Sequence, residues 1–178
     1  MSKIWFTSDT HFCHDKEFVW KARGYESVEK MNLDIMDRWN TTVNNHDDIY
    51  HLGDVMLKDN EKGMEILSQL KGHIHIILGN HDSDRRIALY MSLPNVVEVV
   101  FATRMKINKH RTFFLSHYPS LVANLDDNKS VWNLSGHTHT TDKFALKQNQ
   151  IYNVGVDAHN CRPVHIDQIL EDIRGLKE

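Results

Sequence analysis

Residues 73–82 read His73-Ile74-His75-Ile76-Ile77-Leu78-Gly79-Asn80-His81-Asp82, and this stretch decides the fold. Its first six residues are predicted to form a strand, and the apolar run from Ile74 to Leu78 is typical of a buried one. The run stops abruptly where a glycine, an amide, an imidazole and a carboxylate follow one another. The change predicts a strand that ends at a polar, chemically active loop.

Four other stretches have the same character: Asp9-Thr10-His11, Gly53-Asp54, Ser116-His117 and Gly136-His137-Thr138-His139. Each follows a predicted strand, at residues 3–8, 49–52, 111–116 and 131–135. In open α/β sheets, ligands bind at the carboxyl ends of the strands because the loops there converge. A buried Asp or His is costly unless it is paired or bound to a metal. The five endings therefore predict one shared site.

Helices are predicted between the first strands. Ser27 is expected to cap a helix whose apolar positions step by three or four residues. Asn60 is expected to cap a second helix, which Gly72 ends. The inward positions of these helices are Val28, Met31, Ile35, Trp39, Val43, Met64, Leu67 and Leu70. The order strand, helix, strand, helix, strand predicts parallel strands with helices packed on the faces.

The pattern changes after a short predicted helix at 84–91. Predicted strands at 96–101, 104–108 and 111–116 follow one another too closely for crossover helices, and they indicate a hairpin in an antiparallel or mixed region. A loop or short helix is expected at 121–130, and a second hairpin at 143–146 and 151–154. Asp167 is expected to cap a last helix with Ile169, Leu170, Ile173 and Leu176 inward.

Length and composition predict a single domain over residues 1–178. The formal net charge is −3, and Lys and Arg are scattered, so nucleic acid is not favoured as a partner. Cys13 and Cys161 lie far apart, which favours a reduced compartment. The sequence contains no apolar run of signal-peptide or membrane length, so we expect a cytoplasmic protein with no membrane partner.

Thirteen histidines are present, and histidine is the commonest metal ligand. The candidate ligands in the polar stretches are Asp9, His11, Asp54, Asn80, His117, His137 and His139. A tetrahedral zinc site needs at most four, so this set fits two metals that share one carboxylate. Oxygen and nitrogen donors favour Mn, Fe, Zn, Co or Ni, whereas Mg and Ca prefer oxygen alone. Two such metals clamp a phosphoryl centre, which points to phosphate ester hydrolysis.

These motifs, in this order, resemble the calcineurin-like metallophosphoesterase superfamily. Three stretches, 7–12, 153–157 and 162–164, further resemble a small bacterial and phage branch of it. The resemblance implies an α/β fold of four layers, in which two mixed β-sheets pack as a sandwich flanked by helices. It also implies two divalent ions, with Mn2+ favoured. One departure is Val55-Met56-Leu57, where many members carry a charged residue.

The resemblance also implies roles for single residues. The first metal is expected on Asp9, His11, Asp54 and His139, and the second on Asp54, Asn80, His117 and His137, with Asp54 as the bridge. A hydroxide between the metals is the expected nucleophile. His81 is expected to assist the leaving group. Asp82 is expected to accept a hydrogen bond from His81, to orient it and to raise its pKa.

The motifs leave the roles of other polar residues open. His14 and Tyr118 are candidates for substrate binding, although His14 can equally pack and Tyr118 can shape a turn before Pro119. Cys13 is expected to be buried beside the site rather than a ligand, and His51 to form hydrogen bonds within the structure. His73 and His75 are expected to be partly exposed. The remaining histidines are expected at the surface: His46, His110, His159 and His165.

The sequence therefore predicts a dinuclear metal-dependent phosphoesterase that cleaves a phosphodiester or phosphomonoester. A small, nucleotide-like substrate is favoured because no additional domain selects a protein or a long duplex. One alternative is a scaffold of the same fold without turnover, but such members lose ligands that this chain retains. A second alternative is a nuclease, which would need a basic track for its polyanionic substrate.

Overall fold

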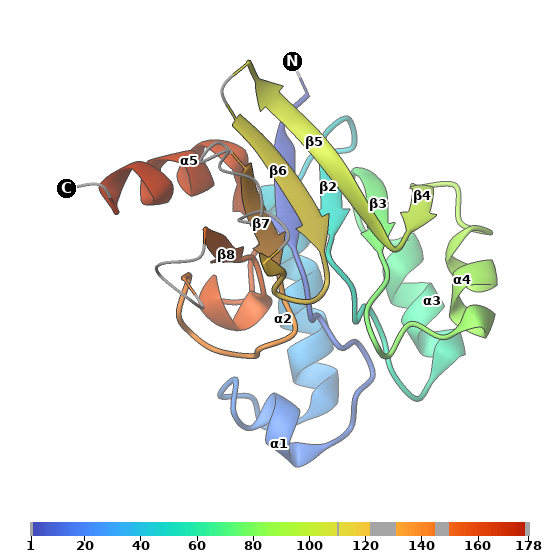
Figure 1. The fold of residues 1–178 in the computed structure, drawn as a ribbon. Helices are drawn as coiled ribbons and strands as arrows, with labels where there is room; N and C mark the ends of the chain where they lie inside the picture. Colours follow the sequence, from blue (N-terminus) through green and yellow to red (C-terminus); the bar gives the residue numbers. More distant parts are fainter. Residues whose placement is uncertain (1, 110, 122–130, 145–149, 177–178) are drawn as a thin grey trace.

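The computed structural model describes residues 2–109, 111–121, 131–144 and 150–176. Its first sheet has five strands in the order β4-β3-β2-β1-β9 (Figure 1). These strands are β1 (Ile4–Thr7), β2 (Asp48–His51), β3 (His73–Ile77), β4 (Val96–Val100) and β9 (Val164–His165). The strands β1 to β4 are parallel, as predicted for the first three, and β9 is antiparallel to β1.

The second sheet has four strands in the order β5-β6-β7-β8. They are β5 (Ala102–Asn108), β6 (Arg111–Ser116), β7 (Val131–Ser135) and β8 (Ile151–Asn153). The pair β5 and β6 forms the hairpin expected in this part of the chain, and β6, β7 and β8 are parallel. The strand predicted at 96–101 belongs to the first sheet instead, because it pairs with β3. Both sheets are mixed, so the predicted α/β sandwich is confirmed.

The helices are α1 (Glu17–Trp20), α2 (Val28–Thr42), α3 (Asn60–Ser68), α4 (Asp84–Tyr90) and α5 (Ile166–Gly175). Ser27 caps α2 as predicted, since its side chain accepts a hydrogen bond from the Lys30 amide. Two other expected caps are wrong by one or two residues. The Asp59 carboxylate caps α3 by accepting a hydrogen bond from the Lys62 amide. The His165 ring caps α5 by accepting one from the Asp167 amide.

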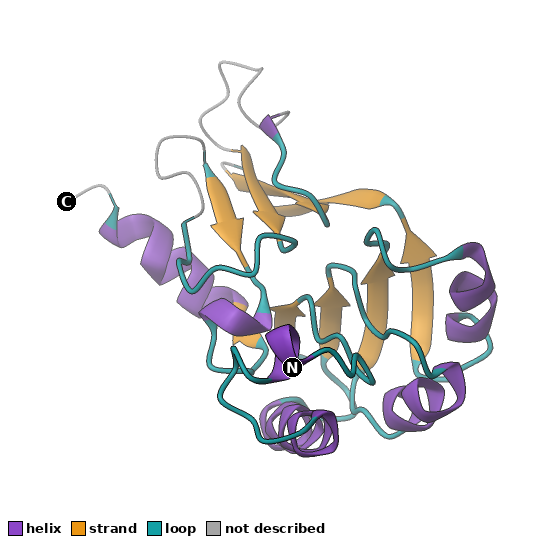
Figure 2. Ribbon diagram, turned by 90° about the horizontal axis from the view of Figure 1, so that it is seen from below, coloured by secondary structure: helices purple, strands orange, loops and turns teal. Residues whose placement is uncertain are grey.

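Two hydrophobic cores separate the layers. The helices α2, α3 and α4 cover the face of the first sheet that points away from the second sheet (Figure 2). Trp39 and Tyr90 are fully buried there. The other core lies between the sheets, where Phe6 and Phe113 meet edge to face with ring centroids 6.2 Å apart. Burial of each such side chain stabilises the folded state by about 2–3 kcal/mol.

The chain between β7 and the last helix differs from the prediction. Lys143 and Phe144 are not in a strand, and residues 145–149 lie outside the described residues, as do 122–130 and His110. The strand β8 pairs in parallel with β7, and on its other side the Asn153 amide donates to the Lys143 carbonyl at 2.8 Å, whereas the rest of the expected hairpin lies outside the described residues. Leu176, expected inward, is 40% exposed. In the described part of the chain, no helix is long and apolar enough to cross a membrane.

Candidate metal centre

The two sheets bring their polar strand ends together. Asp9 and His11 follow β1, Asp54 follows β2, and Asn80 follows β3. The second sheet adds His117 after β6, and His137 and His139 after β7. Because the sheets pack face to face with these ends at the same side, residues separated by up to 128 positions come within hydrogen-bonding distance. The predicted convergence of the seven candidate ligands is therefore present in the described residues.

The backbone at these ligands is strained. Several of them have a positive φ: Asp9 (57°), His11 (50°), Asp54 (57°), His137 (70°) and His139 (50°). Residues other than glycine seldom adopt this left-handed conformation, and it persists only where the surroundings impose it. Such strain gathers at functional sites. Here it turns each side chain off the end of its strand and into the centre.

Two glycines allow the strands to approach one another at the site. Gly53 has a φ of +91°, so it makes the turn that places Asp54. Gly136 has an ordinary φ, and its importance is space, because a Cβ atom there would collide with the side chains of Ser8 and Asp9. The Asp9 carboxylate instead lies against the backbone and accepts a hydrogen bond from the His137 amide at 2.9 Å.

The first half of the centre joins Asp9, His11 and His139. The Nε2 atoms of the two histidines lie 3.1 Å apart. Asp9 Oδ1 lies 4.0 Å from His11 Nε2 and 3.8 Å from His139 Nε2. Asp54 Oδ2 lies 3.6 Å from His11 Nε2. Four donor atoms from three loops therefore point at one small volume.

The second half joins Asn80, His117 and His137. His117 Nε2 lies 3.0 Å from Asn80 Oδ1 and 3.2 Å from His137 Nδ1. The same nitrogen lies 3.6 Å from Asp54 Oδ2. Asp54 Oδ2 is thus equally distant from an imidazole of each half, which is the position of the shared carboxylate in the predicted arrangement.

The donor atoms fit bound metal ions. Ligands held at about 2.1 Å by one ion lie about 3.0–3.4 Å apart, close to the spacing of these atoms. Asp9 Oδ1 is buried and has no hydrogen-bond partner among the described residues, a costly state that a cation would relieve. Burial lowers the pKa of His11, so its ring is neutral and can donate a lone pair. Two overlapping groups qualify: Asp9, His11 and His139, and Asp9, Asp54 and His117.

A buried ion pair supports the first half, and the sequence did not reveal it. Asp157 Oδ2 lies 3.1 Å from His139 Nδ1. It can accept a hydrogen bond from Nδ1–H, which keeps the proton on Nδ1 and leaves Nε2 free to bind a metal. Arg23 donates to both oxygens of Asp157, at 2.8 and 3.0 Å, and to the Asp9 carbonyl at 2.7 Å. Asp157 lies in the stretch 153–157 that resembles one branch of the superfamily, which was the available signal.

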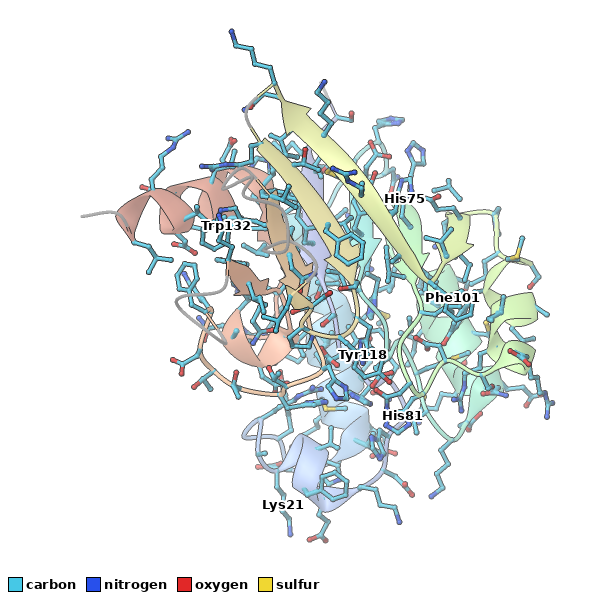
Figure 3. The ribbon with its side chains drawn as sticks, in the orientation of Figure 1. Lys21, His75, His81, Phe101, Tyr118 and Trp132 are labelled. Carbon is cyan, nitrogen blue, oxygen red and sulfur yellow. The ribbon has the colours of Figure 1, made fainter. Side chains whose placement is uncertain are left out.

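The second half is supported by the backbone instead. His117 Nδ1 lies 2.8 Å from the Leu52 carbonyl oxygen, which fixes the proton on Nδ1 and leaves Nε2 free. Tyr118 packs its ring edge-on against His117 and His137, with centroids 5.1 and 4.6 Å apart, and is 51% exposed. Tyr118 therefore lies at the rim of the centre. Figure 3 shows it near His81, beyond the carboxyl ends of the strands.

His81 is beside the ligands and open to solvent. Its side chain is 42% exposed, and Nε2 lies 4.0 Å from Asp54 Oδ2. Its backbone amide donates to Asp54 Oδ1 at 2.9 Å, which fixes the turn that carries it. The ring meets His11 edge-on and faces His14, whose ring centroid is 6.3 Å away.

The expected hydrogen bond between His81 and Asp82 is wrong. Asp82 is buried, and its carboxylate accepts from the amides of Asp54 and Gly79 at 2.8 and 2.9 Å and from the Tyr90 hydroxyl at 2.8 Å. The backbone turns between the two residues, so their side chains diverge although they are adjacent in sequence. Asp82 joins the loops after β2 and β3 rather than orienting His81.

The other histidines and Cys13 mostly follow expectation. Cys13 is buried beside Asn32, and burial raises the pKa of its thiol to about 11. His51 is fully buried and contacts the Thr10 hydroxyl at 2.9 Å. Two residues expected at the surface have structural roles instead. His159 is half-buried and its Nε2 lies 2.8 Å from the Asn153 carbonyl oxygen, and His165 caps α5.

The fold and the donor set define an α/β protein of two mixed sheets with a candidate dinuclear metal centre. The sequence profile of the calcineurin-like phosphoesterase superfamily domain matches residues 2–163. The chain belongs to that superfamily, as its motifs predicted.

Similar proteins come from an archaeon and from phages, and a similar solved structure comes from a bacterium. The uncharacterized protein MJ1445 of Methanocaldococcus jannaschii is 31% identical over 96% of this chain and 91% of its own length. The Gene 66 protein of Mycobacterium phage D29 is 26% identical over 100% and 99%. The crystal structure of the protein of unknown function AQ665 from Aquifex aeolicus has a TM-score of 0.74 at 23% identity, covering 96% of this chain and 99% of that one. This last similarity supports the fold.

Proposed function

We propose that the protein is a dinuclear metal-dependent phosphoesterase that hydrolyses a small phosphodiester or phosphomonoester. The observation that carries the proposal is the buried Asp54 oxygen, 3.6 Å from an imidazole nitrogen of each half of the centre. Superfamily membership supports the same reaction class. The net charge of −3 favours a small nucleotide-like ester over a polyanion.

In this proposal each half of the centre holds one ion, and Mn2+ is favoured. The first ion is held by Asp9, His11, Asp54 and His139, and the second by Asp54, Asn80, His117 and His137. When bound, two divalent ions neutralise phosphoryl oxygens and lower the pKa of water.

The residues of this chain supply position and a proton. Asp54 holds both halves at a fixed spacing, and its Oδ1 anchors the turn that carries His81. The exposed His81 ring can reach an ester bound at the centre, where it donates a proton to the departing oxygen. Tyr118, at the rim beside His117 and His137, lies where it can contact the phosphoryl group or its substituent.

The direct test is hydrolysis by purified protein supplied separately with Mn, Fe, Zn, Co or Ni. We expect Mn to support cleavage of bis-p-nitrophenyl phosphate, measured as released p-nitrophenolate, and the Asp54→Ala variant to be the inactive control. Cleavage of p-nitrophenyl phosphate alone would replace the diester preference with a monoesterase. Metal binding without cleavage of either compound would favour the scaffold alternative.

A further inference from the structure

A cavity opens from the metal centre toward α1. Its volume is about 470 Å3, within the range of small-ligand sites. Its lining includes the imidazoles of two candidate ligands, His11 and His139, and that of His81 beside them. The lining also has an apolar part, Phe18, Val19 and Ala22, and the ion pair of Arg23 and Asp157. Figure 3 labels Lys21 at the end of α1, and His81 lies on the side of the centre that faces this helix.

Phe18 has an unusual position for its residue type. Its side chain is 74% exposed, although phenylalanine is usually buried. The ring meets His14 edge to face, with centroids 5.7 Å apart and planes at 86°. His14 in turn packs against His11, at 5.3 Å between centroids. An aromatic surface therefore extends without interruption from the metal ligands to Phe18.

An occupant attached to the phosphoryl group fits this cavity, because the candidate ligands His11 and His139 line both the cavity and the centre. A free phosphate ion would leave the apolar side chains of the cavity uncovered. A flat aromatic group would cover the exposed face of Phe18, since bases stack on aromatic side chains. Lys16 and His14, which also line the cavity, can contact the polar edge of such a group.

We infer that the cavity binds the nucleoside of a nucleotide ester, with its base against Phe18, and that this nucleoside is the leaving group. The assignment rests on the proposed function. It follows from the place of His81, which lines the cavity and lies 4.0 Å from the shared Asp54 oxygen. Water forms a new bond to phosphorus and releases one proton to solvent. The P–O bond to the nucleoside breaks, and the departing oxygen takes a proton from His81.

The test compares two phosphonates, whose P–C bonds a phosphoesterase does not cleave. Methylphosphonate fills only the metal centre, and adenosine 5′-methylenephosphonate also fills the cavity. Binding to Mn-loaded protein is measured by titration calorimetry. We expect Phe18→Ala to weaken binding of the adenosine compound by about tenfold and that of methylphosphonate by less than about twofold.

Two further variants complete the design. Phe101→Ala removes a phenylalanine that is 79% exposed and outside the cavity, and it should change neither affinity. Ala22→Trp should fill the cavity and weaken only the adenosine compound, with a thermal melt to verify folding. Equal affinities of the two compounds for the unaltered protein, or an equal loss of both in Phe18→Ala, would overturn the inference.

The same samples separate this inference from the proposed function. Cleavage of bis-p-nitrophenyl phosphate without any preference for the adenosine compound would reject the nucleoside cavity and leave the phosphoesterase intact. A preference that depends on Phe18, without cleavage of any ester, would retain the binding cavity and reject its role in leaving-group departure.

Discussion

Asp47 and Asp9 are buried carboxylates at opposite ends of the first sheet, and they differ in how far their oxygens are hydrogen-bonded. Asp47, at the amino end, accepts hydrogen bonds from the Lys3 amide at 2.9 Å and from the Trp5 indole and the Asn44 amide at 3.0 Å. Asp9, at the carboxyl end, has a buried oxygen without a partner among the described residues. One end of the sheet is satisfied within the fold, and the other is prepared for a ligand.

The pKa values follow the same division. Burial raises the pKa of Asp9, and hydrogen bonds and nearby histidines offset this only in part. Burial acts on Asp47 in the same direction, but hydrogen bonds from Lys3, Asn44 and Trp5 outweigh it and lower the pKa to about 2. The carboxyl end of the sheet therefore lacks folding stability that the amino end has, and bound metals would restore it.

The largest effect is expected from Asp54→Ala. This change removes the oxygen that lies 3.6 Å from both halves of the centre, so both ions should be lost and hydrolysis should fall below detection. Elemental analysis of the purified protein measures the metal content. The matched control is Asp47→Asn at the other end of the sheet, which should retain both ions. Two ions in Asp54→Ala would refute the shared-carboxylate assignment.

A smaller effect is expected from His81→Ala. Turnover should fall by roughly a hundredfold or more, because a proton donor at the leaving oxygen contributes on that scale. Metal content should be unchanged, because the half-exposed His81 lies beside the seven candidate ligands and is not one of them. Steady-state rates with an activated and a poor leaving group test this role, because only the poor leaving group depends on the proton. Unchanged turnover with the poor leaving group would remove His81 from the mechanism.

At the amino end, Asp47→Asn should lower the free energy of unfolding by about 2 kcal/mol above pH 4. The folded pKa of about 2 lies below the ordinary value of 3.8, so this stability is present above pH 4 and is lost as the pH falls toward 2. Urea unfolding of both proteins at pH 6, 4 and 2 measures the difference. A gap between the two proteins that stays constant down to pH 2 would contradict the role of the charged carboxylate.

The smallest effect is expected from Asp157→Asn. The variant keeps an acceptor for His139 Nδ1 but loses the charge that pairs with Arg23, so the affinity of the first ion should fall by about tenfold. Metal titration should show a weaker first site and an unchanged second site in comparison with the unaltered protein. Asp172→Asn, which removes the partner of Lys143, is the matched control. An equal loss at both sites would place Asp157 outside the first half.

The sequence predicted the ligands because strand ends are local features. An apolar run that stops at Gly79-Asn80 or at Gly53-Asp54 can be recognised without knowing which strands pair. Arg23 and Asp157 could not be predicted in this way, because they lie 134 positions apart and meet only after both sheets have packed. Asp82 was misjudged for the converse reason, since adjacency in sequence suggested a contact that the turn prevents.

Caps and strand partners were the weaker predictions in the fold. Asp59 and Asn60 are both good caps, and only the geometry of the turn selects the carboxylate. The strand β4 was assigned to the hairpin region by its proximity in sequence, whereas its backbone pairs with β3. Such choices depend on contacts between distant segments, which periodicity does not report.

The position of β1 has a consequence for the order of events during synthesis. This strand lies between β2 and β9, so one neighbour is made soon after it and the other more than a hundred residues later. Segments made first fold first, and distant pairings form slowly. An ion that arrives early would meet only the ligands of the first sheet. The complete centre can form only after His137, His139 and Asp157 have left the ribosome.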